Sequence, residues 1–254
     1  MSNALIFAAG LGTRLKPLTD TMPKAMVPVN GKPLLQILIE KLQHAGVTEI
    51  VINVHHFAQQ IVDFVYKSDF SKTLGNINIQ ISDETDCLLE TGGGLKKAAR
   101  LFHNDAPILV HNVDILSNVD LRDFYHGVVQ SGSQAATLIV SERQTQRYLL
   151  ADENSCLVGW TNIATGEVKS PYKNLNVDRC RKVAFSGIQV FSQEVLPLMD
   201  TWQGKFSIID FYLSICDKAE IRLELRKDLK LLDVGKLDTI AQAEEFLRIQ
   251  NSTT

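Results

Sequence analysis

The sequence predicts an α/β fold: a mostly parallel, Rossmann-like sheet with flanking helices, followed by a smaller mixed β region. Three observations predict it. Short Val/Ile/Leu-rich runs alternate with longer helical patterns in the first half, and from about residue 134 the runs become β-rich and are separated by polar turns. A content of 45% hydrophobic and 22% charged residues in a chain of 254 is ordinary for a globular protein with a full core.

In the first half, each predicted strand is a short run rich in branched apolar residues, and each predicted helix is a longer amphipathic pattern. Short connections between alternating strands and helices favour parallel strands joined by right-handed crossovers. The predicted strands are Leu5–Ala9, Glu49–Asn53, Ile77–Ser82 and Ile108–His111, and the predicted helices are Leu34–Ala45, Phe57–Tyr66 and Gly93–Leu101.

The second half predicts a partly antiparallel region, because its β-rich runs follow one another through polar turns. We expect a single domain with a core over 1–133, a mixed β part over 134–225 and a return to the core over 226–254. The predicted elements are strands at Ala135–Val140, Arg147–Ala151, Leu157–Trp160, Lys182–Phe191 and Glu220–Leu225, helices at Phe206–Lys218 and Leu237–Ile249, and a short apolar run at Leu229–Leu232.

Charge, hydropathy and cysteine usage exclude several classes of function. The net charge of −3 gives no general attraction to nucleic acid, so any polyanion must be held by a local site. No apolar run approaches the roughly 20 residues of a membrane span, and the N-terminus lacks a basic-then-apolar secretion signal. The four cysteines lack the paired spacing of zinc or redox sites. We therefore expect a cytoplasmic monomer or small homo-oligomer that binds neither nucleic acid nor membrane.

A glycine loop follows the first predicted strand. Gly10 and Gly12 end the run Leu5–Ala9, Arg14 follows at once, and Lys24 comes after a short loop. Bare backbone N–H groups at the end of a buried strand suit a phosphate chain, and two cations can follow its charge during a reaction. The pattern indicates a nucleoside triphosphate site. The alternative is a glycine turn with solvated basic residues.

Two other phosphate-binding motifs do not match this loop. A dinucleotide-binding fingerprint needs a third glycine three residues after the second, where this chain has Leu15. A Walker A loop needs Gly-Lys-Ser/Thr, whereas the pair Gly31-Lys32 runs into Pro33. The sequence therefore argues against both of these protein classes.

Two aspartates follow apolar runs, at the place where ligands bind in open α/β sheets. Asp114 comes after Ile108–His111, close to Asn112, and Asp233 follows Leu229–Leu232. If those runs are neighbouring strands, the two carboxylates can hold one Mg²⁺, which favours one or two carboxylates together with waters and phosphates. The alternative is that each aspartate caps a loop or a helix.

Three consecutive glycines, Gly92 to Gly94, follow Thr91 at a predicted helix start. Such a run is costly in chain entropy, and it makes sense if a flat group such as a nucleobase presses against the backbone. The alternative is a flexible turn. Glu84 could face the edge of the base, although a solvated loop glutamate is the simpler interpretation.

No motif supports covalent catalysis. There is no Gly-x-Ser-x-Gly elbow, and His55, His56 and His111 have no second ligand at metal spacing. One reaction class needs neither. A sugar 1-phosphate is already an anion near neutral pH, since the second pKa of a phosphate monoester is about 6. Its oxygen can attack the α-phosphorus of a nucleotide without a general base, while metal, cations and amides align the phosphates and stabilise the departing pyrophosphate.

The motif Gly10-x-Gly12-Thr13-Arg14-Leu15-x-Pro17-Leu18-Thr19, with Pro23-Lys24 and Val27-Pro28-Val29, resembles the signature of sugar-1-phosphate nucleotidyltransferases. The stretch from Leu89 to Gly94 is similar to that of N-acetylmuramate-1-phosphate uridylyltransferases and mannose-1-phosphate guanylyltransferase-like proteins. The resemblance implies a nucleotide-binding core, a sugar-binding β part, and Mg²⁺-dependent transfer from an NTP to a sugar 1-phosphate. UTP with N-acetylmuramate 1-phosphate is the expected pair; the alternatives are GTP with mannose 1-phosphate, or a nucleotide-binding protein without turnover.

The resemblance also implies roles for particular residues. Arg14, Lys24 and Asp114 would be catalytic, Asp114 and Asp233 would hold Mg²⁺, and Gly187 and Lys24 would face the sugar. The family pattern is broken by Ala25, where many relatives have proline, and by Val113, whose Cβ could crowd the sugar or forbid a positive φ. The implied nucleotide-binding residues are Ala8, Ala9, Gly10, Gly12, Thr13, Arg14, Glu84, Thr91, Gly92, Gly93 and Asn112.

Overall fold

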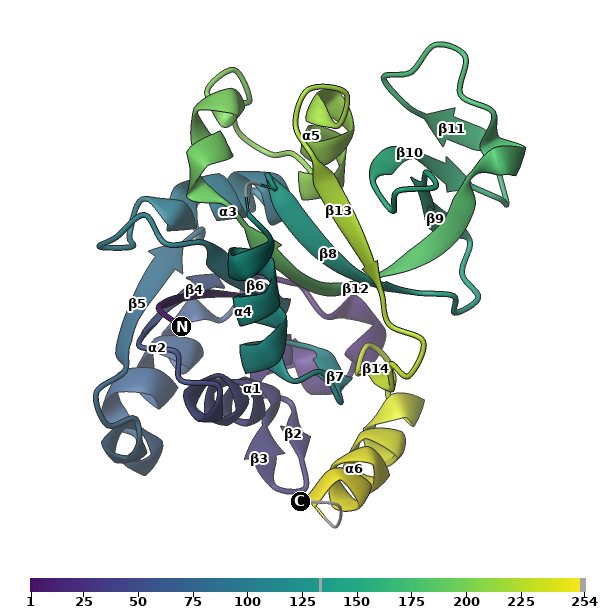
Figure 1. Ribbon diagram of the computed structural model, residues 1–254. Helices are drawn as coiled ribbons and strands as arrows, with labels where there is room; N and C mark the ends of the chain where they lie inside the picture. The colour runs from purple at the N-terminus through teal and green to yellow at the C-terminus, as the bar shows by residue number, and fades with distance from the viewer. Residues whose placement is uncertain (133, 252–254) are drawn as a thin grey trace.

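The computed structural model describes residues 1–132 and 134–251, and its main feature is a ten-stranded sheet (Figure 1). The longest path through this sheet runs in the order β11-β10-β9-β12-β6-β1-β4-β5, and β8 and β13 join it beside β12. Its strands are β1 Asn3–Phe7, β4 Glu49–Val54, β5 Asn78–Asp83, β6 Ile108–Asn112, β8 Ala136–Ser141, β9 Arg147–Ala151, β10 Leu157–Asn162, β11 Glu167–Lys169, β12 Arg181–Phe191 and β13 Ile221–Leu225.

The centre of the sheet is parallel, as the sequence predicts. β1 pairs in parallel with β4 on one side and β6 on the other, and β4 pairs in parallel with β5. Ala4, Leu5 and Ile6 of β1 have no exposed surface. Leu5 faces one apolar core cluster, while Ala4 and Ile6 face another, because successive side chains of a strand point to opposite faces.

Helices cover both faces of the sheet (Figure 1). Burying an apolar helix face against a sheet is the main source of stability in this layered architecture. The core on one face contains residues of α1 Leu34–His44, α2 Ala58–Lys67, α4 Leu121–Ser131 and α6 Asp238–Asn251, and the core on the other contains residues of α3 Glu90–Ala99 and α5 Ile208–Ile215. Short 3₁₀ helices connect these elements at Thr13–Leu15, Leu18–Asp20, Lys24–Met26, Asp69–Thr73, Val177–Arg179 and Gln193–Met199.

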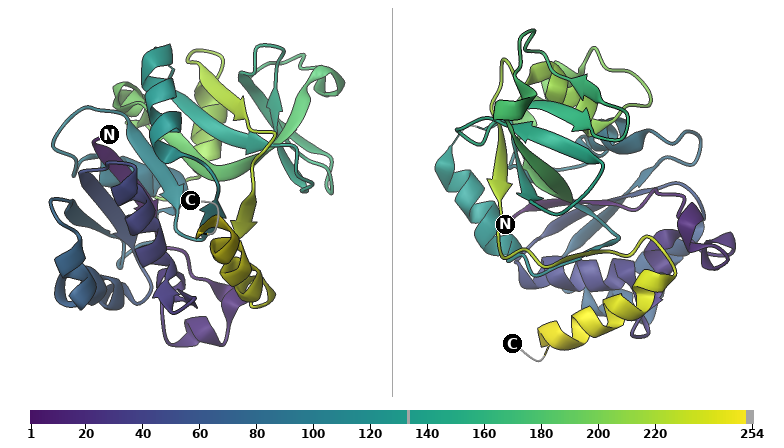
Figure 2. Two further views of the ribbon diagram at one scale, coloured as in Figure 1. Left: turned by 60° about the horizontal axis from the view of Figure 1, so that its bottom comes forward. Right: turned by 90° about the vertical axis from the view of Figure 1, so that its right-hand side faces the viewer.

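The second half forms the predicted antiparallel region, which extends from the long strand β12. One end of β12 pairs with β6 and the other with β9, both antiparallel, while β8 pairs along its other edge. The extension β9–β10–β11 stands apart from α1 and α2 in the left view of Figure 2. The sheet is therefore continuous from the parallel core into the β-rich part of the chain.

Two small antiparallel sheets lie outside the main one. β2 Pro28–Val29 pairs with β3 Lys32–Pro33, and β7 Ile115–Ser117 pairs with β14 Leu231–Asp233. The sequence-based condition that the apolar run before Asp233 neighbours the strand before Asp114 is thus wrong. β14 joins β7, the short strand that follows β6, and not β6 itself.

The three consecutive glycines lie inside α3, which begins earlier than predicted, at Glu90. The chain's own packing explains why side chains are absent there. A Cβ on Gly92 would lie 2.4 Å from the ring of Phe206, and one on Gly93 would lie 2.5 Å from the carbonyl oxygen of Gly204. The interpretation of a flexible turn is wrong, and the absence of side chains needs no ligand to explain it.

In the part of the chain that the structure describes, no helix combines the length and the apolar character needed to cross a bilayer.

Replacing Gly92 with alanine tests the packing of α3 against residues 204–206. The new methyl group would overlap the Phe206 ring, so the variant is expected to lose about 1–3 kcal/mol in the free energy of unfolding. Chemical denaturation measures this value. Gly127→Ala in α4 is the matched control: nothing lies within 4 Å of its added methyl group, and it is expected to gain about 0.4–1 kcal/mol. Equal stability of the two variants would contradict the packing explanation.

Candidate active site

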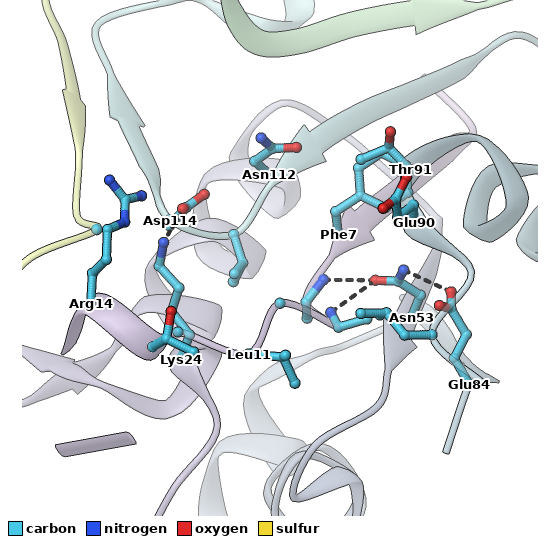
Figure 3. Close-up of a pocket in the computed structure, with 18 of the residues that line it drawn as sticks. Phe7, Leu11, Arg14, Lys24, Asn53, Glu84, Glu90, Thr91, Asn112 and Asp114 are labelled. Carbon is cyan, nitrogen blue, oxygen red and sulfur yellow. Dashed lines mark hydrogen bonds and ion pairs between the residues drawn. The ribbon is translucent and has the colours of Figure 1, made fainter. Parts of the chain in front are cut away.

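A cleft of about 660 Å³ opens at the carboxyl ends of β1, β4 and β6 (Figure 3). This is the edge of the sheet where the sequence predicts a ligand. The sheet and its loops bring together most of the predicted site residues, although many are far apart in the chain. The cleft is lined by Phe7, Ala8, Ala9, Gly10, Leu11, Gly12, Thr13, Arg14, Lys24, Asn53, Glu84, Leu88, Glu90, Thr91, Asn112, Val113, Asp114, Arg147, Ser207 and Gly235.

The glycine loop after β1 presents backbone amides to this cleft. Asn53, at the end of β4, accepts hydrogen bonds through Oδ1 from the N–H groups of Ala8 (2.7 Å) and Ala9 (3.2 Å). Within residues 1–132 and 134–251, the N–H groups of Gly10, Leu11 and Gly12 have no hydrogen-bond partner. The amides available to a phosphate are therefore the later ones of the loop, while those of Ala8 and Ala9 hold its shape.

Gly12 must be glycine for two reasons. Its φ is +62°, a left-handed conformation that strains other residues. A Cβ there would also lie 2.8 Å from Cγ2 of Thr19, whose hydroxyl donates to the Gly12 carbonyl oxygen at 2.8 Å. The loop is thus closed on itself before the chain reaches Arg14.

Glu84 is buried, with 1% of its surface exposed, so the simple interpretation of a solvated loop glutamate is wrong. Its Oε1 accepts from Nδ2 of Asn53 at 2.9 Å, and its Oε2 accepts from the backbone N–H of Leu89 at 3.0 Å. Glu84 therefore links Asn53, and through it the glycine loop, to the start of α3. The sequence offered one signal for Asn53: it is a polar residue near the end of a buried apolar strand.

Lys24 and Asp114 line the other end of the cleft, and Asp233 lies beside them. Antiparallel pairing of β14 with β7 sets Asp233 opposite Ile115, and the N–H of Val234 donates to the Asp114 carbonyl oxygen at 2.8 Å. The Lys24 ammonium forms an ion pair with Asp114 and lies 4.0 Å from Oδ1 of Asp233. The two carboxylates are thus neighbours, although 118 residues separate them (233 − 114 = 119, less one).

Arg14 lies against the same group through Gly235. A Cβ at Gly235 would be 2.7 Å from Oδ1 of Asp233 and 2.9 Å from Nη2 of Arg14. Only a residue without a side chain lets both groups approach the backbone this closely. In Figure 3, Arg14, Lys24 and Asp114 lie at one end of the cleft, and Asn53, Glu84 and Thr91 at the other.

Two carboxylates, Asp114 and Asp233, and two cations, Lys24 and Arg14, lie close together at this end. Burial raises the pKa of the Asp233 carboxyl above its usual value, and the nearby Asp114 carboxylate raises it further, while Lys24 and Arg14 act in the opposite direction. Two neighbouring carboxylates beside a cleft that also holds backbone amides without a partner match the donor set of Mg²⁺, which binds one or two carboxylates together with waters and phosphates. Asp114 and Asp233 therefore fit a magnesium ion.

Two side chains, those of Lys41 and Asn118, hold the segments that carry Asp114 and Asp233. Nζ of Lys41 in α1 donates to the carbonyl oxygen (2.6 Å) and the hydroxyl (3.1 Å) of Ser117, the last residue of β7. Asn118 joins β7 to the start of β14: its side chain accepts from the N–H of Lys230 at 2.8 Å and donates to the carbonyl oxygen of Asp228 at 3.0 Å. This small sheet is therefore tied to the core at one end.

Other predicted site residues occupy different positions. Gly187 lies behind Asn112: its φ is +81°, and a Cβ there would be 2.8 Å from Nδ2 of Asn112. The Thr91 hydroxyl lines the cleft but accepts the N–H of Ile208 at 3.0 Å, while Gly92 and Gly93 face residues 204–206. Val113 has a negative φ, so the concern about a positive φ does not apply.

A second cavity, of about 580 Å³, adjoins the cleft on the β9–β11 side. Arg147 and Ser207 line both. Sequence reasoning missed both residues, together with Gly235. In the sequence, Arg147 is only the first residue of a predicted strand, and no nearby residue indicates that this strand lies beside the cleft.

The fold and the cleft define a class of protein: an α/β protein with a glycine loop, two cations and Asp114 at the carboxyl ends of its parallel strands, with Asp233 beside them. Comparison with known sequences identifies the class further. The sequence matches the nucleotidyl transferase family over residues 3–250, and the chain belongs to that family.

Individual relatives agree with this assignment. N-acetylmuramate α-1-phosphate uridylyltransferase from Caulobacter vibrioides is 44% identical over 111 residues, which cover 44% of this chain and 45% of that protein. Mannose-1-phosphate guanyltransferase from Gibberella zeae is 33% identical over 145 residues, covering 57% and 39%. The chain thus spans less than half the length of these two curated relatives. The crystal structure of HddC from Yersinia pseudotuberculosis complexed with GMP-PN superimposes with a TM-score of 0.73 at 25% identity, covering 97% and 100%.

The position of Lys41 predicts a pH dependence of stability. Burial lowers its pKa to about 8, partly offset by Asp120, whereas an unfolded lysine has a pKa of about 10.4. Between these values the unfolded chain binds more protons, so rising pH stabilises the folded state. Relative to Lys41→Met, the wild type should gain up to about 1.4 kcal/mol per pH unit between pH 8 and 10.

Denaturant titrations across that pH range measure the difference. Lys173→Met removes an exposed lysine without an ion pair in the described part of the chain, and it should follow the wild type at every pH. A Lys41→Met stability difference that stays constant from pH 7 to 10 would contradict the burial argument.

Proposed function

We propose that this protein transfers a nucleotidyl group from a nucleoside triphosphate to a sugar 1-phosphate, with Mg²⁺, and releases pyrophosphate. The observation that carries the proposal is the arrangement of Lys24 between Asp114 and Asp233, beside the free amides of the glycine loop. Membership of the nucleotidyl transferase family supports it. Since its substrates would be nucleoside triphosphates and sugar phosphates, the proposal places the protein in the cytoplasm.

Different residues of the cleft have different roles in the proposed reaction. The amides of Gly10 to Gly12 and the Arg14 guanidinium hold the β- and γ-phosphates, and their charges favour the departing pyrophosphate. Lys24 faces the α-phosphate, where the acceptor oxygen forms its bond to phosphorus as the bond to the β-phosphate oxygen breaks. Held by Asp114 and Asp233, Mg²⁺ would neutralise phosphate charge and orient the two reactants. No residue needs to remove a proton, because the acceptor phosphate is already an anion.

The shape of the cleft suggests where each part of the substrates binds. The phosphates belong at the end with Arg14, Lys24 and Asp114, which leaves the end with Glu90 and Thr91 for the nucleoside (Figure 3). The second cavity adjoins the first beside the mixed β part, and we assign it to the sugar. Its walls include the ring of Trp160, which suits a pyranose face.

UTP with N-acetylmuramate 1-phosphate is the first candidate pair, because a relative with that printed activity is 44% identical over its matched segment. GTP is the second candidate nucleotide. A relative at 33% identity is a mannose-1-phosphate guanyltransferase, and a structural neighbour is complexed with GMP-PN.

Removing either carboxylate tests the catalytic assignment. Asp114→Asn and Asp233→Asn should each lower the rate of pyrophosphate release at least about 100-fold, while the thermal midpoint shows that the fold persists. Asp105→Asn, an exposed aspartate ahead of β6 at the opposite end of the strands, is the control and should keep wild-type rates. Unchanged turnover in both site variants would refute the role of the carboxylate pair.

A panel of four nucleoside triphosphates against several sugar 1-phosphates tests the substrates. The highest kcat/KM is expected for UTP with N-acetylmuramate 1-phosphate. A clear preference for GTP with mannose 1-phosphate would replace this candidate by the second one. Nucleotide binding without pyrophosphate release for any pair would instead indicate a binding protein that has no turnover.

A further inference from the structure

Arg147 occupies the junction between the cleft and the second cavity. It is the first residue of β9, in the antiparallel extension, and it lines both spaces together with Ser207. The cleft already has two other cations, Arg14 and Lys24, which follow the glycine loop. Arg147 is thus a cation at the place where a group in one space would meet a group in the other.

The charge of Arg147 is not compensated by the protein. Among residues 1–132 and 134–251, no carboxylate forms an ion pair with its guanidinium, and no hydrogen bond of that group occurs. Two further cations, Arg143 and Lys169, line the second cavity. Arg143 donates from Nη2 to the carbonyl oxygen of Phe185 at 3.1 Å, and Lys169 pairs with Asp210 at 3.1 Å and lies 4.0 Å from Glu167. Its ammonium also lies 5.3 Å from the centre of the Trp160 ring. Lys169 is therefore already neutralised and the Arg143 guanidinium is hydrogen-bonded to the backbone, whereas Arg147 can bind an anion.

The same junction lies at the start of α5. Ser207 is the N-cap residue of this helix and accepts the N–H of Ile209 through its hydroxyl at 3.1 Å. The first two amides of α5 are already bonded, that of Ile208 to the Thr91 hydroxyl, and Asp210 lies in the first turn, so the group at the junction that favours an anion is Arg147.

We propose that Arg147 binds the 1-phosphate of the acceptor and thereby sets the preference for phosphorylated sugars. This inference rests on the proposed function. A guanidinium can form paired hydrogen bonds with two phosphate oxygens, which fixes both the position and the direction of the group. The sugar ring of the acceptor then lies in the second cavity, and Arg147 holds its phosphate at the junction. The charge of Arg147 screens the repulsion between this phosphate and the nucleotide phosphates. The acceptor oxygen can then face the α-phosphorus.

Arg147→Gln tests this role by steady-state kinetics. The variant keeps a long polar side chain but loses the charge, and the KM for the sugar 1-phosphate should rise about 10- to 100-fold, with the KM for the nucleotide within about twofold of wild type. Arg147→Lys keeps the charge but not the paired hydrogen bonds, so its KM for the sugar 1-phosphate should lie between those of the wild type and Arg147→Gln. Arg179→Gln, at an exposed arginine of the same β-rich part that lines neither space, should match the wild type.

Each outcome separates this inference from the proposed function. Turnover by the wild type with an unchanged sugar-phosphate KM in Arg147→Gln would overturn the inference alone. A rise confined to the nucleotide KM would also overturn it, by assigning Arg147 to the triphosphate. If the wild type releases no pyrophosphate with any sugar 1-phosphate of the panel, the proposed function fails, and this inference fails with it. Equal thermal midpoints for the wild type and the variants would exclude a merely structural effect.

Discussion

Two carboxylates held side by side are the constraint on which the rest of the structure depends. Asp114 and Asp233 repel one another, and partial burial adds to the cost by raising the pKa of Asp233. The protein offsets this with Lys24, which pairs with Asp114 and lies within 4.0 Å of Asp233, and with Arg14 beside Gly235. The arrangement makes chemical sense when a divalent cation and phosphates complete it, because each added group then meets an opposite charge.

The fold keeps these groups in place through polar contacts, some buried and some at the surface. Lys41 holds the end of β7, and Asn118 closes the β7–β14 sheet that brings Asp233 to Asp114. His111 precedes Asn112 in β6, and it stays neutral because burial lowers its pKa to about 3. On the far side of the cleft, Asn53 and Glu84 form a second buried pair that shapes the glycine loop. Each end of the cleft is therefore held by polar contacts with the elements around it.

Glycine residues show how far local reasoning reaches. The loop at Gly10 to Gly12 could be interpreted from sequence, because its chemistry depends on the strand before it and the cations after it. The glycines Gly92 to Gly94 could not. A side chain at these positions would clash with Phe206, Gly204 or Glu84. Phe206 and Gly204 lie more than 100 residues away in the chain (204 − 94 = 110). When a distant segment leaves no room for a side chain, the sequence shows the glycine but does not show which segment requires it.

The sequence by itself determined the alternation of strands and helices, the parallel core and the loop that ends β1, because short-range periodicity and turn chemistry encode them. Only the tertiary structure decided that β14 pairs with β7, that Glu84 is buried and bonded to Asn53, and that Arg147 lies where two cavities meet. These features arise from contacts between segments far apart in the chain. Hydrophobic pattern specifies which face of an element is buried, but not which distant element will cover it.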